Sequence, residues 1–487
     1  MDSASAAPRG PGPARAGAGL GRRARPFFSF PPTRPRSLLP PSLPFHSLSP
    51  IPSCPHHLSL STLCPPLSAT PHSAEVISYS EWRDLYYVQT AKGAYIKNTV
   101  ENYPESVTVS EVSNEKRREK RGGREMGGGA REPAGGVAPR ARPSSSLSLS
   151  SRPSHPHTPH TPQAIGYGMI AAVLTDHKYD FDQFFKFYQN FGNSKSGMMA
   201  WQIIQSGSDL KPNPNPNAHA DDSGTDGDMD AGMALVLAHD KWGDAAYLTA
   251  AKKVSAALMK YTINPTSKLP NLGDWVTGDP DEMQDRGAPG VGPRKYHYVT
   301  RASDCMAWNM EVLAKVDPKW KQVQQACLAA LVQMSEASGC GLPPDFAIYN
   351  PSTKRTEPVP SDVPLLEKLG DADYSWNACR TPWRLAAYIK HSSDPLARRA
   401  ASAMTTFFEE RAFSKLYAGY NLPGCTPRVD YINAAFSGPA WALLKAMGKN
   451  DAAAAMEDQI RTARAVPKWG KAYYSDSILL LSQLETR

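Results

Sequence analysis

Residues 225–242 read TDGDMDAGMALVLAHDKW, and this stretch decides the kind of fold that the sequence can form. Its apolar residues recur three or four positions apart, at Met229, Met233, Val236 and Leu237. This spacing places them on one face of an α-helix. The acids at the start of the stretch fit the first turn of such a helix, where the dipole favours negative charge. We therefore predict a helix that begins with carboxylates and buries one side.

Helical spacing of apolar residues recurs along most of the chain after residue 74, whereas strand patterns are scarce. About ten such segments within roughly 360 residues predict one all-α domain, and helical hairpins packed in a ring fit this pattern. The clearest of them span 80–100, 181–191, 245–261, 319–337, 381–392, 395–412, 439–448 and 475–485.

Two segments lack the apolar periodicity that a buried core requires. Residues 1–73 are rich in Pro, Ser, Leu and Arg, and residues 112–163 run from a charged block through Gly to Ser, Pro and His. We predict that both are disordered. The domain prediction is therefore a segment 1–73 without a core, followed by a catalytic domain at 74–487 that the insert 112–163 interrupts.

The basic character of the chain comes from these two segments. The net charge is +8, but residues 1–73 hold seven arginines against the single acid Asp2, and residues 112–163 hold ten basic against four acidic residues. The remaining residues carry a slight negative charge, so nothing in them suggests a nucleic-acid partner. No apolar run is long enough to span a membrane. The seven cysteines show no CxxC spacing, so we expect no metal site, and we expect no cofactor.

The insert separates two halves of one motif. Without residues 112–163, Ser110-Glu111 directly precedes Ala164–Met169, and the joined sequence reads SEAIGYGM. We interpret the insert as a retained intron, since its first two residues can be encoded by a splice-donor sequence and Gln163 by CAG. The alternative is a natural surface loop, because long loops are tolerated on surfaces.

The joined SEAIGYGM resembles the acid motif of glycoside hydrolase family 8. Residues 225–230, TDGDMD, resemble the family's second motif, although Gly224, Ala231 and Gly232 depart from its pattern. Residues 377–384, NACRTPWR, resemble its third. The three motifs stand in the family's order, and the resemblance implies an (α/α)6 barrel.

The resemblance also implies an inverting hydrolysis of glycosidic bonds. One carboxylic acid protonates the leaving oxygen, and a carboxylate about 6.5–9.5 Å away activates water. By motif, Glu111 is the general acid, and Tyr167 is a candidate for the apolar wall that keeps it protonated. By the second motif, Asp226 matches an acidic residue of the family that binds the sugar at the cleavage point. The alternative interpretations are that Glu111 is a solvated surface glutamate and that Asp226 only caps a helix.

The general base is the harder assignment. One branch of the family has an aspartate where this chain has Asn377, and an amide cannot accept the proton. The branch that this chain resembles takes its base from a glutamate in the preceding loop. We therefore predict Glu367, with Asp371 and Asp373 as alternatives.

Sugar-binding sites need flat apolar faces with polar groups at the rim. A buried tryptophan is more often part of the core, so each aromatic assignment has that alternative. The predicted substrate-binding residues are Trp201, Trp275, Arg380, Asn377, Tyr167 and Tyr473, with Tyr474 as an alternative to its neighbour.

The function predicted from the sequence is an endo-hydrolase of a β-1,4-linked polysaccharide such as cellulose, mixed-linkage glucan or chitosan. The competing class is a non-catalytic carbohydrate-binding protein, or an inactive product of a faulty gene model. We expect a monomer, and family resemblance implies secretion even though the start of the sequence shows no signal-peptide pattern.

Overall fold

The structure is a computed structural model. Glu111 and Glu367 lie outside the residues that it describes, as do residues 1–73 and nearly all of the insert. All described residues belong to one compact unit, Pro71–Arg487. They span 75–97, 162–206, 209–214, 220–276, 296–362, 365–366, 370–466 and 471–487.

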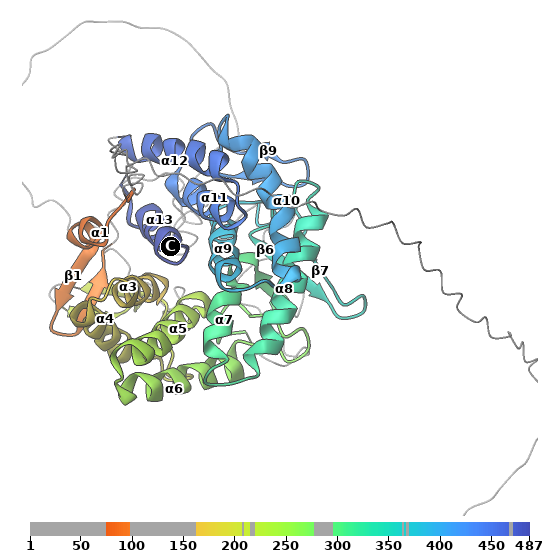
Figure 1. Cartoon of the computed structure of the whole chain (residues 1–487). Coiled ribbons are helices and arrows are strands. Elements are labelled where there is room, and N and C mark those ends of the chain that lie inside the picture. The colour runs from red at the N-terminus through yellow and green to blue at the C-terminus, as the bar shows by residue number, and fades with distance from the viewer. Residues whose placement is uncertain are drawn as a thin grey trace, which may run out of the picture. The chain divides into compact units, whose positions relative to one another are not determined.

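Six helices form an inner ring (Figure 1). Each packs against the next, and the last packs against the first, so the ring is closed. They are α3 (Pro162–Leu174), α5 (Thr225–Trp242), α7 (Ala307–Leu313), α9 (Thr381–His391), α11 (Ala434–Ala446) and α13 (Tyr473–Leu484).

Six further helices surround that ring in the described part of the chain. Inner and outer helices alternate along the sequence, so each hairpin contributes one helix to each layer. The prediction of an (α/α)6 barrel is therefore confirmed. The outer helices are α1 (Tyr79–Tyr86), α4 (Lys178–Asn190), α6 (Ala245–Tyr261), α8 (Trp320–Ala337), α10 (Pro395–Ala412) and α12 (Asn450–Ala465).

Composition explains which helices lie inside. The inner helix α11 is buried from Ala434 to Leu444, and its sequence is apolar on all sides. The outer helix α12 buries only one stripe, which includes Met456 and Ile460, and exposes charged residues. A helix that is apolar all round must be covered by neighbours, whereas an amphipathic one can face water.

The two ends of the described chain meet and complete the outer layer. Helix α1 packs on α13, where Trp82 Nε1 donates to Ser477 Oγ at 2.9 Å and Tyr86 OH donates to Asp476 Oδ2 at 2.8 Å. These hydrogen bonds join segments that lie about 390 residues apart in the sequence.

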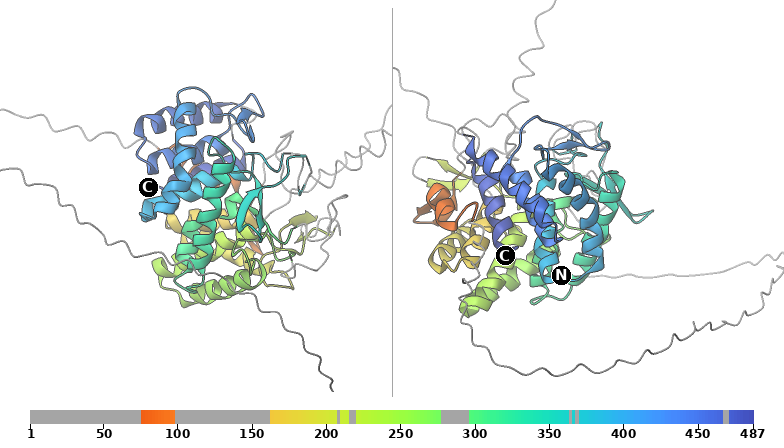
Figure 2. Two further views of the ribbon diagram at one scale, coloured as in Figure 1. Left: turned by 90° about the vertical axis from the view of Figure 1, so that its right-hand side faces the viewer. Right: turned by 45° about the horizontal axis from the view of Figure 1, so that its top comes forward.

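Short antiparallel strands lie in the connections and gather on one side of the helices (Figure 2). The pairs are β1 (Tyr87–Thr90) with β2 (Gly93–Ile96), β3 (Ile203–Ser206) with β4 (Asp209–Pro212), β6 (Phe346–Asn350) with both β5 (Val299–Arg301) and β7 (Arg355–Pro358), and β8 (Tyr420–Asn421) with β9 (Thr426–Pro427).

A disulfide joins Cys340, after α8, to Cys425, between β8 and β9. The described cysteines that remain free, Cys305, Cys327 and Cys379, are all buried. None of the described helices is long and apolar enough to cross a membrane.

Candidate active site

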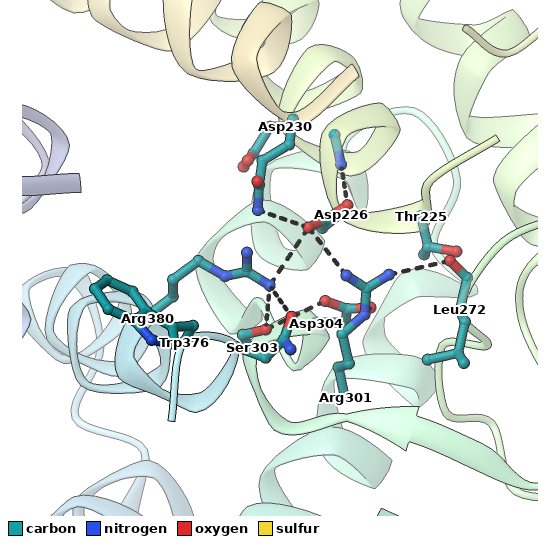
Figure 3. A network of polar contacts seen from close by, with 12 residues as sticks. Thr225, Asp226, Asp230, Leu272, Arg301, Ser303, Asp304, Trp376 and Arg380 are labelled. Atoms are coloured by element: carbon teal, nitrogen blue, oxygen red, sulfur yellow. Dashed lines mark hydrogen bonds and ion pairs between the residues drawn. The ribbon is translucent and has the colours of Figure 1, made fainter. Parts of the chain in front are cut away.

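Residues at or just before the starts of several inner helices share one polar network (Figure 3). Asp226 lies in the first turn of α5. Arg301 comes from the end of β5, before α7, and Arg380 from the turn before α9. Backbone N–H groups at these helix starts carry partial positive charge, so the place favours carboxylates.

Asp226 is the centre of this network, and its side chain is 7% exposed. Its Oδ2 lies 3.5 Å from Arg301 Nη1 and 3.4 Å from Arg380 Nη2, and its Oδ1 accepts from Gly227 N at 3.0 Å. Burial alone would raise the pKa of Asp226, but the two guanidinium groups and the Gly227 N–H hold it below its usual value. Asp226 is therefore a buried, ionised carboxylate rather than only a helix cap.

Arg380 is held by several groups at once. Its Nη2 donates to Ser303 Oγ at 2.7 Å and to Asn377 Oδ1 at 3.4 Å, and its Nη1 donates to Tyr474 OH at 3.5 Å. Tyr474 in turn donates to the carbonyl of Trp376 at 2.5 Å. The structure thus brings the predicted pair Arg380 and Asn377 together with Asp226. Tyr474, rather than its neighbour, joins the network.

Asp345 fixes the turn that carries Asn377. Its Oδ1 accepts from the backbone N–H groups of Ser375, Asn377 and Ala378 at 3.0, 3.1 and 2.6 Å. These hydrogen bonds satisfy backbone N–H groups at the start of the turn, which buried donors require. The side chain of Asn377 is therefore presented from a rigid turn.

Two members of the network, Arg301 and Asp304, were missed by the sequence analysis. Arg301 Nε lies 3.3 Å from Asp304 Oδ2, and Arg301 Nη2 donates to the carbonyl of Leu272 at 3.2 Å. Burial raises the pKa of Asp304 to about 6, against the opposing effect of Arg301. The available signal was RASD at 301–304, since residues three apart meet on one side of a 3₁₀ turn.

The first turn of α3 also contacts the polar network around Asp226. Gln163 Nε2 donates to Asp226 Oδ2 at 2.8 Å. Residues 162 and 163 were expected to belong to a disordered insert, but they begin the helix, and proline is favoured at the first helical position.

The glycines of the Gly-Tyr-Gly sequence let α3 approach its neighbours. A Cβ on Gly166 would stand 2.8 Å from the carbonyl oxygen of Gly227 in α5, and one on Gly168 would stand 2.7 Å from the ring of Phe184 in α4. Contacts this short leave no room for a side chain, so small residues set the position of the first turn of α3 against Asp226.

The other two aspartates of the motif support the helices. Asp230 pairs with Arg384 of α9 through two contacts of 2.6 and 2.8 Å. Asp228 accepts from Tyr188 OH at 2.5 Å and from Met199 N at 3.1 Å. Burial raises the pKa of Asp228 to about 8, so this carboxyl is largely neutral at pH 7.

The two alternative bases accept hydrogen bonds from backbone N–H groups, Asp371 within its own loop and Asp373 from the segment after β8. Asp371 Oδ2 accepts from the N–H groups of Leu365 and Leu366 at 2.9 Å each. Asp373 Oδ1 accepts from Leu422 N at 2.8 Å, and its Oδ2 lies 3.2 Å from Arg428 Nη1. These contacts occupy oxygens that a general base would need for water.

The predicted aromatic contacts are divided between half-buried and buried side chains. Trp201 and Trp275 are half-buried, and the ring of Trp275 packs edge-on against Tyr296 at 5.0 Å. Tyr167 and Tyr473 are only 1% and 7% exposed, and Tyr167 packs against Trp383 at 5.8 Å. The role of these side chains in sugar binding stays a prediction.

Among the residues that the structure describes, no group of His, Cys, Asp or Glu is arranged to hold a metal ion. What the site contains is an ionised carboxylate, two fixed guanidinium groups and amide donors. Such an arrangement can orient a neutral polyhydroxylated ligand by hydrogen bonds.

Comparison with known proteins gives the family. The sequence profile of the glycosyl hydrolases family 8 matches residues 150–487, which is more than half of the chain. The chain belongs to glycosyl hydrolase family 8. It is therefore a glycoside hydrolase related to endo-β-1,4-glucanases.

Curated relatives of this family 8 chain are bacterial enzymes. It is 28% identical over 348 residues to the beta-glucanase of Niallia circulans, covering 66% of this chain and 75% of that protein. It is 25% identical over 328 residues to endoglucanase A of Acetivibrio thermocellus, covering 66% of this chain and 60% of that protein.

Solved family 8 structures share the fold. The apo β-1,3-1,4-glucanase of Paenibacillus sp. X4 superposes with a TM-score of 0.61 at 22% identity, covering 84% of this chain and 90% of that one. A cold-adapted family 8 xylanase superposes with a TM-score of 0.54 at 14% identity, covering 68% and 80%. At such low identities the likeness concerns the fold alone.

Proposed function

We propose that this chain, read without residues 112–163, is an inverting endo-hydrolase of a β-1,4-linked glucan-type polysaccharide. The observation that carries the proposal is the ionised Asp226, which lies at the converging helix starts within one hydrogen bond of the first turn of α3. The names of the relatives, beta-glucanase and endoglucanase, support this substrate class.

The proposed reaction uses two carboxyl groups. Glu111 gives its proton to the glycosidic oxygen as the C–O bond breaks. A water molecule attacks the anomeric carbon from the opposite face and gives its proton to Glu367, so the configuration inverts. The carboxylate of Asp226 stabilises the positive charge that develops on the sugar ring.

Substrate contacts are proposed from residues of known position. Arg380 and Asn377 present fixed polar groups beside Asp226, where sugar hydroxyls can bind. Trp201 and Trp275 are half-buried and offer ring faces for stacking, whereas Tyr167 and Tyr473 line the wall behind them in this proposal.

Glu367 is preferred as base because of its neighbours. Asn377 carries an amide, which cannot take up a proton, and Asp371 Oδ2 accepts from the N–H groups of both Leu365 and Leu366. Asp371 thereby fixes the segment that leads directly to Glu367.

The acid is tested by Glu111→Gln in the chain that lacks residues 112–163. The amide keeps the shape of the side chain but cannot donate an acid proton, so we expect hydrolysis to fall at least 100-fold with binding of the polymer retained. NMR of the products of the unsubstituted chain should show inverted anomers. A variant that keeps more than about a tenth of the rate would contradict the acid assignment.

The base is tested by Glu367→Ala in the same chain. We expect turnover to be lost and azide, which needs no general base, to restore bond cleavage with a glycosyl azide as product. Asp371→Asn and Asp373→Asn are the matched controls. Rescue of either aspartate variant by azide, with Glu367→Ala still active, would move the role to that aspartate.

We further propose that the enzyme acts as a secreted monomer on its polysaccharide. The Cys340–Cys425 disulfide supports an oxidising compartment, since such bonds persist outside the cytosol. Fractionation of expressing cells together with size-exclusion chromatography of the folded protein tests both statements.

A further inference from the structure

The residue before Ala164 decides which chemical group meets Asp226. In the 487-residue chain that residue is Gln163, which is half-buried in the first turn of α3. When residues 112–163 are left out, the peptide bond joins Glu111 to Ala164, so Glu111 takes the place of Gln163 in the chain. Glutamine and glutamate have the same length and shape, and differ only in the terminal group.

We propose that Gln163 occupies the general-acid position, so that the chain with residues 112–163 binds β-glucan without cleaving it. This inference rests on the proposed function. In this proposal the 487-residue form binds carbohydrate without hydrolysing it, and the shorter form, without residues 112–163, hydrolyses it.

The contact of Gln163 supports this assignment. Its Nε2 donates to Asp226 Oδ2 at 2.8 Å, the same oxygen that faces Arg301 and Arg380. Since Asp226 is ionised, it can only accept a hydrogen from position 163, and the amide N–H of Gln163 provides one.

A carboxyl group at position 163 would meet the same neighbour. Two carboxylate oxygens at hydrogen-bond distance cannot both be charged and unprotonated without strong repulsion. Because the arginines keep Asp226 ionised, the proton stays on the group at position 163. A glutamate there is thus kept protonated, as a general acid requires, while the amide can donate a hydrogen bond but no acid proton.

The rest of the site is formed with glutamine at this position. The ion pairs of Asp226 and the hydrogen bonds of Arg380 to Ser303 and Asn377 are formed in the chain that carries Gln163. We therefore expect sugar binding to survive in the longer chain.

The decisive experiment is Gln163→Glu in the full 487-residue chain, with residues 112–163 still present. The substitution changes one terminal group, and Gln163→Ala is the matched control. Initial rates on soluble mixed-linkage glucan and carboxymethyl cellulose are compared among the full chain, both variants and the joined chain, and binding is measured by affinity electrophoresis in the same polymers.

We expect the unsubstituted full chain to bind both polymers but to hydrolyse at least 100-fold more slowly than the joined chain. Gln163→Glu should recover hydrolysis, and Gln163→Ala should not. An unsubstituted full chain that is as fast as the joined chain would overturn the inference.

The inference and the proposed function fail in different ways. If the joined chain hydrolyses glucan while Gln163→Glu stays inert, the inference is wrong and the proposed function stands. If neither chain hydrolyses any glucan and Gln163→Glu is also inert, the proposed function itself is wrong, and the inference falls with it.

Discussion

Gly166 of α3 lies directly against Asp230 of α5: a Cβ on the glycine would stand 2.7 Å from the Cβ of Asp230. The same Cβ would stand 2.8 Å from the carbonyl oxygen of Gly227. This close approach fixes the position of the first turn of α3 relative to Asp226. The position of residue 163 in the site therefore depends on Gly166, three residues further along the chain, having no side chain.

Gly166→Ala should move α3 away from α5 and destabilise the barrel. The new methyl group meets backbone, which cannot move aside, and overpacking of this kind costs about 1–3 kcal/mol. Gly232→Ala is the control, because its Cβ would meet only side chains, those of Leu313 and Val254 at 3.3 Å and that of Leu258 at 3.9 Å. Urea unfolding of the two variants measures the difference, and equal losses would contradict the packing argument.

Asp226→Asn in the joined chain should abolish most of the hydrolysis. The amide is neutral, so it removes the carboxylate that pairs with both Arg301 and Arg380 and cannot stabilise positive charge on the sugar. Removing one electrostatic stabiliser typically lowers kcat about 10²–10³-fold. A kcat within tenfold of the unsubstituted value, with thermal stability retained, would show that Asp226 is structural only.

Asp228 should make the barrel less stable as the pH rises. Burial raises its folded pKa to about 8, whereas an unfolded aspartate has a pKa of about 3.9. The folded state binds more protons between these values, so this contribution is full below pH ~4 and is lost towards pH ~8. Asp228→Asn mimics the neutral carboxyl, and should therefore remove this pH dependence.

The measurement for Asp228 is urea unfolding at pH 5 and pH 7.5. We expect the unsubstituted chain to lose stability relative to Asp228→Asn on going to the higher pH. Parallel changes in the two proteins would mean that Asp228 is ionised in the folded state.

Asp230→Asn should destabilise the barrel strongly, or prevent folding. Asp230 and Arg384 are 0% and 2% exposed as side chains, and the substitution leaves the guanidinium charge buried without its partner. Breaking a buried pair in this way costs about 3–5 kcal/mol. The exposed pair of Arg399 and Glu336 is the control, and Arg399→Met should cost less than about 1 kcal/mol.

Peptide mass spectrometry of the native protein tests the interpretation of residues 112–163. Trypsin cleaves after Lys97 and Lys178, so the joined chain gives one peptide that contains residues 98–111 followed by 164–178. We expect this peptide. Its absence, together with abundant EMGGGAR from residues 125–131, would contradict the retained-intron interpretation.

The sequence by itself determined the helical architecture and the motif that begins α5. Apolar residues at helical spacing are a local property, so segments such as 225–242 and 395–412 could be assigned without any partner. The order of the three motifs indicated the family and placed Asp226, Asn377 and Arg380 in one site. Their common position at helix starts made that prediction possible.

Only the tertiary structure decided what surrounds Asp226. Arg301 comes from a strand 75 positions away and Gln163 from another helix 63 positions away, and no local pattern encodes such contacts. The charge states of Asp226 and Asp228 also differ, although both residues stand in one turn of the same sequence motif. Two arginines keep Asp226 ionised, whereas burial keeps Asp228 neutral. Charge state depends on neighbours in space, because desolvation and ion pairing act through the folded surroundings rather than along the chain.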